Sequence, residues 1–389
     1  HVDNTNLGTG IGISGSGITV RNNISWSNDV AGIDVHDGLI ENNVVFDNAV
    51  GITANGGVAR GNRAYNNTNS GIRGLENSLI EGNTAYANDI GVTSASAFIG
   101  VGSEFKGQLS NNIVYDNHSY GIVVGQGSGA LVNNNTVYQP AGIGIQVGDS
   151  SSSTTLRNNI IQTSADAAIV VTSDSQNGFL SNYNLIYTPG AGTLGRWGTT
   201  DFDSRADWFY ELGLDANSLA GETAVFDPQF VDVDGLDGVL GYVGGVDGGL
   251  DDDFHVQSTS PAIDGGFLDD PFENELGANG GRINVGAYGN TAEAANSPPE
   301  VIQVLSPNGL EKYESGQQIT INWHQHGDFN ESPEQAYRLY VDSLDPVASW
   351  QFEESAGATV AIDQVGDRDG TYIGSPTLAA TGAFGTTLG

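Results

Sequence analysis

Several residue types that often determine a protein's chemistry are missing from this sequence. Its 389 residues include no cysteine, which excludes disulfide bonds, thiolate nucleophiles and cysteine-ligated metal centres. Methionine is also absent, even from position 1, so we expect a processed or trimmed chain. No apolar run approaches the roughly 18–20 residues that cross a membrane, and no signal peptide is evident, so we expect no membrane span.

Basic residues are scarce, with 12 lysines and arginines against 47 aspartates and glutamates and a net charge of −35. The imbalance is uneven, because residues 1–200 hold 14 acidic and 7 basic residues, whereas residues 201–389 hold 33 and 5. A field of this sign repels nucleic acid and attracts cations, so we expect no nucleic-acid partner. The composition is typical of a secreted protein in a medium that contains calcium, and acidity that serves only solubility is the alternative.

What the sequence does contain is a repeated Asn-x-x-aromatic motif, whose copies lie 19 to 29 residues apart. A Gly-aliphatic pair, such as Gly32-Ile33 or Gly51-Ile52, precedes each early copy. Periods near 20 residues indicate a solenoid, and short runs rich in Gly, Asn and β-branched residues exclude helical repeats. We therefore predict an all-β chain whose residues 10–190 form a right-handed parallel β-helix of about eight turns. The motif asparagines are Asn23, Asn43, Asn62, Asn83, Asn112, Asn135, Asn159 and Asn184.

In such a coil, each motif position becomes a column of side chains one turn apart. The asparagines should form a ladder of amide hydrogen bonds and accept the left-handed corner conformation. The aromatic residues should stack along the axis and fill the core or one corner. Arg21, Glu41, Arg60 and Glu81 alternate in sign and predict a surface ladder of ion pairs. The aromatic column comprises Trp26, Phe46, Tyr65, Tyr86, Tyr115 and Tyr138.

The sequence predicts four regions, of which residues 1–190 are the β-helix. Residues 191–296 should close the coil and include one short helix at 204–215, with Ser204 as N-cap and Gly213 as its stop. After a proline-containing linker, residues 297–344 contain the alternating stretch QQITINW and predict a small immunoglobulin-like β-sandwich. Residues 345–389 resemble the opening strands of a laminin-G-like sandwich, which would be incomplete here. We therefore expect the partners to be other copies or other domains of a larger surface protein.

An acidic segment after the coil predicts a calcium site. Residues 232–238, Asp-Val-Asp-Gly-Leu-Asp-Gly, resemble the calcium loops of acidic extracellular repeats, in which carboxylates wrap a hard cation around a glycine bend. The EF-hand spacing is incomplete because Leu236 occupies a ligand position, and a solvated acidic loop is the alternative. The glycines of residues 10–15 match a dinucleotide fingerprint without the strand-to-helix unit it requires, so we expect no nucleotide or redox cofactor. The predicted calcium ligands are Asp232, Asp234, Asp237, Asp251 and Asp253.

Four features together resemble one family. The Asn-x-x-Tyr turns, the stretch DPQFVD at 227–232, SPAIDG at 260–265 and GRINVGAYGN at 281–290 are similar to bacterial secreted right-handed parallel β-helix repeat proteins. The resemblance covers residues 10–296 and implies a modular protein that is secreted or lies on the bacterial cell surface. It is specific for architecture and says little about activity.

Residues 31–37, Ala-Gly-Ile-Asp-Val-His-Asp, are similar to the Tyr-Gly-Phe-Asp-Pro-His-acid motif of uronate epimerases on this fold. The resemblance implies that Asp34 and His36 form an acid–base pair that removes a proton next to a carboxylate. Arg73, about two turns away, would hold that carboxylate. Ala31 and Val35 depart from the tyrosine and proline of the motif, and the coil offers few other cations for a polyanion.

Two classes of function follow from these features. The first is a non-catalytic extracellular or cell-surface module with a structural or adhesive role, in which fibre formation and carbohydrate binding are further expectations. The alternative is a polysaccharide lyase or uronate C5-epimerase that acts on an acidic glycan through Asp34, His36 and Arg73. Extracellular polysaccharide is the expected ligand in both classes, and the sequence leaves enzymatic activity open.

Overall fold

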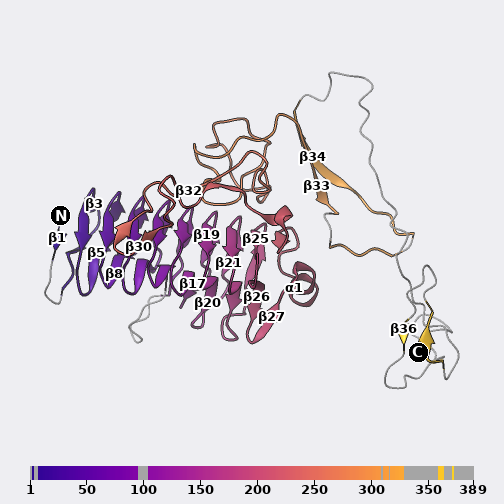
Figure 1. Ribbon diagram of the computed structural model, residues 1–389, viewed down its shortest axis with the longest axis horizontal. Helices are drawn as coiled ribbons and strands as arrows, with labels where there is room; N and C mark the ends of the chain where they lie inside the picture. Colours follow the sequence, from indigo (N-terminus) through magenta and orange to yellow (C-terminus); the bar gives the residue numbers. More distant parts are fainter. Residues whose placement is uncertain are drawn as a thin grey trace. The chain divides into compact units, whose positions relative to one another are not determined.

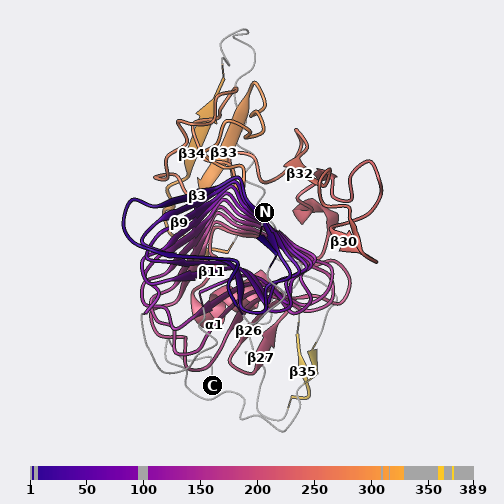
Figure 2. The ribbon, with the colours of Figure 1, turned by 90° about the vertical axis from the view of Figure 1, so that its left-hand side faces the viewer.

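The computed structural model shows two compact units, residues 1–328 and residues 329–389. In the first unit the chain winds through three sheets in turn and forms a parallel β-helix, seen from the side in Figure 1 and along its axis in Figure 2. The prediction of an all-β, right-handed parallel coil is confirmed. The structure describes residues 2–3, 8–94, 104–307, 310–314, 316–327, 358–362 and 370–371.

Within these residues, each turn adds one strand to sheet B, then one to sheet C, then one to sheet A. Sheet A consists of β1 (Val2–Asp3), β4 (Ile24–Trp26), β7 (Val44–Phe46), β10 (Arg63–Tyr65), β13 (Thr84–Tyr86), β16 (Ile113–Tyr115), β19 (Thr136–Gln139), β22 (Ile160–Thr163), β25 (Leu185–Tyr187) and β28 (Leu219–Gly221). Sheet B consists of β2 (Ile11–Ser14), β5 (Ala31–His36), β8 (Val50–Asn55), β11 (Ser70–Leu75), β14 (Ile90–Thr93), β17 (Tyr120–Gly125), β20 (Ile143–Gly148), β23 (Ala167–Val171), β26 (Thr193–Trp197) and the antiparallel β27 (Thr200–Phe202). Sheet C consists of β3 (Thr19–Arg21), β6 (Leu39–Glu41), β9 (Val58–Arg60), β12 (Leu79–Glu81), β15 (Gln108–Ser110), β18 (Leu131–Asn133), β21 (Thr155–Arg157) and β24 (Leu180–Asn182).

The core of the coil is a set of aliphatic columns, because in-register parallel strands place equivalent side chains one above another. In sheet B the column passes from Ile33 through Ile52 to Ile72, all fully buried. Sheet C adds the buried residues Ile40 and Ile80. The repeated aliphatic positions of the sequence therefore build one continuous hydrophobic core.

The predicted asparagine ladder runs from Asn23 to Asn184. At Asn83, the main-chain N–H and Nδ2 both donate to Oδ1 of Asn112, at 3.0 and 2.9 Å, and Nδ2 also donates to the carbonyl of Ala59. Oδ1 of Asn83 accepts the same pair of bonds from Asn62. Each side-chain amide therefore makes hydrogen bonds to buried backbone groups at the corner. It also makes hydrogen bonds to the side-chain amides of the turns before and after it.

One detail of this prediction was wrong. The left-handed conformation belongs to the residue before each ladder asparagine, such as Asn42 (φ 55°), Gly82 (φ 61°) and Asn111 (φ 54°). The chain must turn at that residue so that the amide of the next one points into the coil. An Asn or Gly at the turning position accepts a positive φ with little strain.

A second, unpredicted ladder lies at the next corner and runs through Asn28, Asn48, Asn67, Asn88 and Asn117 to Gln139. Each of its asparagines follows an asparagine of the first ladder by five residues, and Gln139 follows Asn135 by four. This ladder explains the glycine of the Gly-aliphatic pair, because a Cβ on Gly51 would collide with the Gly71 carbonyl and lie 2.9 Å from Nδ2 of Asn67.

The aromatic column lies on the outer face of sheet A, and the expectation that it fills the core or a corner was wrong. Middle residues of these short strands, such as Ala64 and Ala85, face the core, so the flanking aromatic residues face outward. The rings of Phe46 and Tyr65 lie 5.0 Å apart, those of Tyr65 and Tyr86 5.2 Å, and those of Tyr86 and Tyr115 4.9 Å, all stacked.

On sheet C, Glu41 lies between two arginines of the predicted ion-pair ladder. Its carboxylate is 3.9 Å from Arg21 and 3.7 Å from Arg60, which confirms this part of the ladder. Both arginine side chains are more than half exposed, so each pair adds at most about 0.5 kcal/mol.

The stacked sheets continue past residue 190 to Gly221, where helix α1 (Arg205–Leu212) closes the core. Oγ of Ser204 caps the helix by accepting the Asp207 N–H, and Gly213 ends it at φ 76°, as predicted. Trp208 of this helix is fully buried, and its Nε1 donates to Oδ2 of Asp215 at 3.0 Å. Oδ1 of Asp215 accepts from Nδ2 of Asn184, the last ladder residue, at 3.1 Å.

The acidic segment of residues 224–256, here called the strap, packs against the outer face of sheet A (Figures 1 and 2). Tyr242 contacts Tyr65 with ring centroids 5.6 Å apart, and Phe254 contacts Tyr115 at 4.6 Å. The strap covers part of the aromatic column. Its elements are η1 (Ala224–Phe226), the antiparallel pair β29 (Phe230–Asp232) and β32 (Asp253–Val256), and the pair β30 (Tyr242–Val243) and β31 (Val246–Asp247).

The two C-terminal predictions are only partly within the described residues. Within the region predicted to be an immunoglobulin-like module, the described residues form the antiparallel pair β33 (Val301–Ser306) and β34 (Asn322–His326), and residues 308–309, 315 and 328–344 lie outside them. The second unit contributes the antiparallel pair β35 (Val360–Ala361) and β36 (Gly370–Thr371), so most of the laminin-G-like prediction also lies outside. Among the described helices, none is long and apolar enough to cross a membrane.

The ladder geometry predicts a large cost for a single amide. Asn83→Ala removes the acceptor of the Asn62 main-chain N–H and leaves buried backbone groups unpaired, so we expect the free energy of unfolding to fall by about 3 kcal/mol. Arg60→Ala, which removes only an exposed ion pair, is the control and should cost less than about 0.5 kcal/mol. Urea denaturation followed by circular dichroism measures both, and equal losses would contradict the ladder's role.

Candidate functional site

The structure places the three predicted catalytic residues on the outer face of sheet B. Asp34 on β5 pairs in register with Thr53 on β8, and Thr53 pairs with Arg73 on β11, so Asp34 and Arg73 share one column two turns apart. His36 lies two residues along β5 and pairs with Asn55. The strand register that the repeat predicts therefore brings Asp34, His36 and Arg73 to one surface.

The contacts of His36 orient its ring toward Asp34. Nδ2 of Asn55 lies 3.1 Å from Nδ1 of His36, and because an amide nitrogen donates, Nδ1 accepts. The proton of the neutral ring then lies on Nε2, which is 3.8 Å from Oδ1 of Asp34. His36 is about half exposed, so this side of the cluster opens to solvent.

Arg73 and Asp34 are only partly satisfied by the described residues. Arg73 is 9% exposed, and neither its Nε nor Oδ1 of Asp34 makes a hydrogen bond to that part of the chain. Burial raises the pKa of Asp34, although the charges of His36 and Arg73 oppose the shift. Burial likewise lowers the pKa of Arg73, against the effect of Asp34. Buried polar atoms without partners are uncommon in structural positions and more frequent at sites that meet a ligand.

This cluster offers an acid, a base and a cation, but not the tyrosine of the epimerase motif. Ala31 stands at that position, and its column continues through Val50, Ser70 and Ile90 before it reaches Tyr120 on β17. Tyr120 is four strands from β5, too far to act beside Asp34. This surface therefore brings together two groups that can exchange a proton, Asp34 and His36, and one cation, Arg73.

The predicted calcium ligands lie in the strap, where several carboxylates accept backbone hydrogen bonds. Oδ2 of Asp251 accepts the N–H groups of Leu236 and Asp237, at 2.8 and 3.2 Å. Oδ1 of Asp253 lies 2.6 Å from Nδ1 of His255. These bonds stabilise tight turns of the strap.

The predicted ligands nevertheless affect one another electrostatically. Partial desolvation, together with the carboxylates of Asp234, Asp251 and Asp253, raises the pKa of Asp232. In the described ranges, no three His, Asp or Glu side chains are grouped so that they could hold one metal ion. Calcium binding by Asp232, Asp234, Asp237, Asp251 and Asp253 stays a prediction.

The sequence patterns missed the charged groups that bind the strap to the coil. Asp247 accepts hydrogen bonds from the Tyr86 hydroxyl at 2.6 Å and from Nη1 of Arg63 at 2.5 Å. Arg63 sits inside a motif copy as an ordinary spacer, and its partner lies 184 residues further along the chain. No local pattern predicts such a pair.

A protein-family model supports the fold. Residues 60–205 match a family model described as a right handed beta helix region. The A-module of the mannuronan C-5 epimerase AlgE6 of Azotobacter vinelandii is 20% identical, with 53% of this chain and 58% of that chain covered at a TM-score of 0.39. The A-module of AlgE4 from the same organism is 18% identical, with 53% and 56% covered at a TM-score of 0.35. This chain thus spans little more than half the length of either module, and no curated protein matches it.

The environment of Asp252 in the strap predicts that the stability of the folded protein depends on pH. Burial raises its pKa to about 6, despite the hydrogen bond that its Oδ2 accepts from the Gly241 N–H. The unfolded value is near 3.9, so this group favours folding below about pH 4, and the contribution is lost as the pH rises through about 6. We expect Asp252→Asn to reduce the fall in melting temperature between pH 4.5 and 7.5. Asp149→Asn, at an exposed left-handed position, is the control, and an identical pH profile for the Asp252 variant and the unmodified protein would contradict the assignment.

The calcium prediction has a separate test. Calcium that binds the folded strap raises the melting temperature by mass action, so millimolar calcium should give a higher value than a chelator. Asp232→Asn should reduce that difference. A melting temperature unaffected by calcium would exclude the site.

Proposed function

We propose that this chain is an extracellular β-helix module that binds an acidic polysaccharide along the outer face of sheet B. The observation that carries the proposal is the buried Arg73, whose Nε makes no hydrogen bond to the described residues, in one column with the partly buried Asp34. Burying a guanidinium without full hydrogen bonding lowers the stability of the fold, and a surface with only a structural role gains nothing that offsets this loss. A ligand carboxylate would supply the missing partner.

The chemistry of Arg73 favours a carboxylate ligand. A guanidinium presents planar, forked N–H groups that match a carboxylate, and such charge-assisted bonds are stronger than neutral ones. Strand spacing places Asp34 and Arg73 about 10 Å apart along the coil axis, so a linear polymer along that axis would meet both. The net charge of −35 opposes a polyanion elsewhere, so binding should depend on this local cation and weaken with salt.

In its non-catalytic form the module would be structural or adhesive. Two amide ladders and in-register sheets hold the outer face in one geometry over successive turns. A rigid surface limits the entropy lost when an extended polymer binds. A location outside the cell or on its surface, and partners among other copies or domains of a larger protein, accord with this role.

A second candidate is catalysis by a lyase or uronate C5-epimerase, favoured by the raised pKa of Asp34 and by the orientation of His36 toward it. One of the two groups would take the proton from the carbon next to the uronate carboxylate, while Arg73 stabilises the charge that develops on the carboxylate oxygens. A lyase would then break the C4–O bond and form the C4–C5 double bond, with the leaving oxygen taking a proton. An epimerase would instead return a proton to the opposite face of the same carbon.

The binding proposal is tested by substitution of the cation. We expect Arg73→Gln to weaken binding of a polyuronate such as alginate or pectate at least tenfold, because one charge-assisted contact is lost. Arg21→Gln, which removes an exposed cation on sheet C, is the matched control and should change affinity little. Isothermal titration at two salt concentrations provides the affinities, and equal affinity for both variants would overturn the proposal.

The catalytic candidate needs a separate readout. A lyase produces an unsaturated uronate that absorbs in the ultraviolet, and an epimerase changes the ratio of C5 epimers seen by NMR. Either product should disappear in Asp34→Asn and His36→Gln while polymer binding persists. Binding without any product from the unmodified protein would leave the non-catalytic module as the function.

A further inference from the structure

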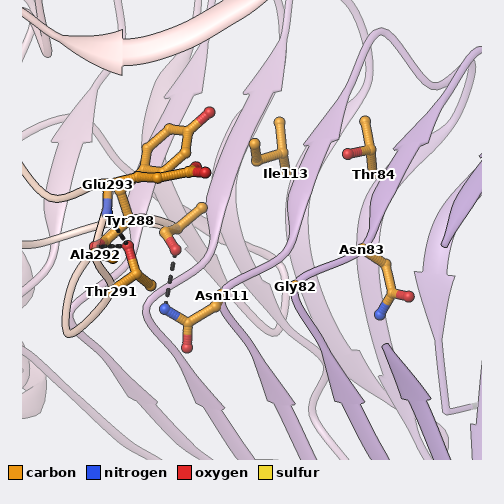
Figure 3. A pocket seen from close by; sticks show the side chains of 10 residues that line it. Gly82, Asn83, Thr84, Asn111, Ile113, Tyr288, Thr291, Ala292 and Glu293 are labelled. Atoms are coloured by element: carbon orange, nitrogen blue, oxygen red, sulfur yellow. Dashed lines mark hydrogen bonds between the residues drawn. The ribbon is translucent and has the colours of Figure 1, made fainter. Parts of the chain in front are cut away.

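A hollow of about 480 Å³ lies on a different side of the coil, between the outer face of sheet A and residues 262–293, here called the return segment (Figure 3). Thr84 on β13 and Ile113 on β16 form its floor, and Tyr288, Thr291 and Glu293 line the opposite side. Its volume is within the range of small-molecule sites in proteins.

The hollow lies where a row of asparagines that bind the return segment to the coil ends. Nδ2 of Asn111 donates to the carbonyls of Ala287 and Gly289, at 2.9 and 2.8 Å, and Nδ2 of Asn134 donates to the carbonyl of Asn284 at 3.0 Å. These asparagines occupy the left-handed corner position of their turns.

At the same position one turn earlier the residue is Gly82, with φ 61° and no side chain. A Cβ built there would meet nothing within 4 Å. The return segment therefore has no anchor at Gly82, and the space beside it stays open.

Several groups that line the hollow are available to a ligand. Neither the Thr84 hydroxyl nor the Tyr288 hydroxyl makes a hydrogen bond to the described part of the chain. Ile113 adds an apolar surface, and Glu293 adds a carboxylate. The lining thus combines hydroxyl, carboxylate and apolar groups. Hydroxyl and carboxylate groups can bind the hydroxyls of a sugar, and an apolar group can contact its ring.

Glu293 lies next to His255 and Asp253, behind the hollow. The His255 ring stacks on Tyr288 with centroids 3.8 Å apart, its Nδ1 lies 2.6 Å from Oδ1 of Asp253, and its Nε2 lies 3.8 Å from Oε2 of Glu293. Asp253 thereby orients His255, whose Nε2 faces the largely exposed carboxylate of Glu293. No lysine or arginine is among the lining residues, so the local charge is acidic.

We propose that this hollow binds an uncharged sugar residue of a glycan, with its hydroxyl groups donating to Glu293 and exchanging hydrogen bonds with Thr84 and Tyr288. The acidic lining repels a uronate, so the site differs in ligand class from the Arg73 surface. It also uses a different sheet, and it does not depend on the proposed function of that surface.

The test uses the full chain and isothermal titration with cellotetraose, mannotetraose and galactotetraose, with tetraguluronate as the anionic comparison. Gly82→Asn completes the anchoring row and fills the hollow, and an asparagine accepts the positive φ at this position. We expect this variant to bind the neutral tetrasaccharide at least tenfold more weakly and the uronate unchanged. Glu293→Gln should also weaken neutral-sugar binding about tenfold, because a hydrogen bond to a charged acceptor is lost.

Gly129→Asn is the matched control, because Gly129 also has a positive φ (76°) and open space around its Cβ position, away from the hollow. It should leave neutral-sugar binding unchanged, and equal melting temperatures for the two asparagine variants would show that both fold. Absence of saturable binding of all three neutral sugars, or equal affinity in the Gly82 and Gly129 variants, would overturn the proposal. If Arg73→Gln abolished neutral-sugar binding and the Gly82 and Glu293 variants did not, the sugar would bind at sheet B. That result would also overturn the proposal.

Discussion

The primary amide of asparagine is the interaction on which this structure depends. It carries a donor and an acceptor on one planar group, so a single side chain can accept from the turn before it and donate to the turn after it. Because the acceptor of each turn also binds a main-chain N–H, a shift in register by one residue would leave several buried backbone groups unpaired. The sheets, the aliphatic columns and the aromatic stack all require the register that these amides maintain.

The features that repeat along the chain could be predicted from the sequence, because every copy reports the same local geometry. The Asn83–Asn112 bond, the Arg21–Glu41 pair and the column of Asp34 over Thr53 and Arg73 follow once the period is known. The side of the sheet on which the aromatic rings lie was not predictable from spacing alone. In a strand of three residues, either the middle residue or the two flanking residues face the core. Both arrangements give a regular column of aromatic rings.

Contacts between the coil and the segments that fold back on it occur once and have no periodic signal. Asp247 binds Arg63 and Tyr86 across 184 and 161 residues, and Asn111 binds the carbonyl of Ala287 across 176. Composition indicates an acidic tail but not where it packs. The position of Arg73 was predictable because it follows from the repeat. Its burial was not predictable, because burial carries no periodic signal. The most informative parts of the candidate sites are therefore the parts that break the repeat.

The side-chain amides of both ladders point the same way, because from Asn23 to Asn159 and from Asn28 to Asn88 each Nδ2 donates to the Oδ1 of the ladder residue in the turn that follows. Dipoles aligned head to tail add up, so the coil has an electrical direction along its axis, as an α-helix does. Its negative end carries the Oδ1 of Asn28, which has no partner among the described residues, and its positive end is the side-chain amide of Asn184. The fully buried carboxylate of Asp215 meets that positive end, and it lets the stack of turns stop inside the protein without leaving a donor unpaired.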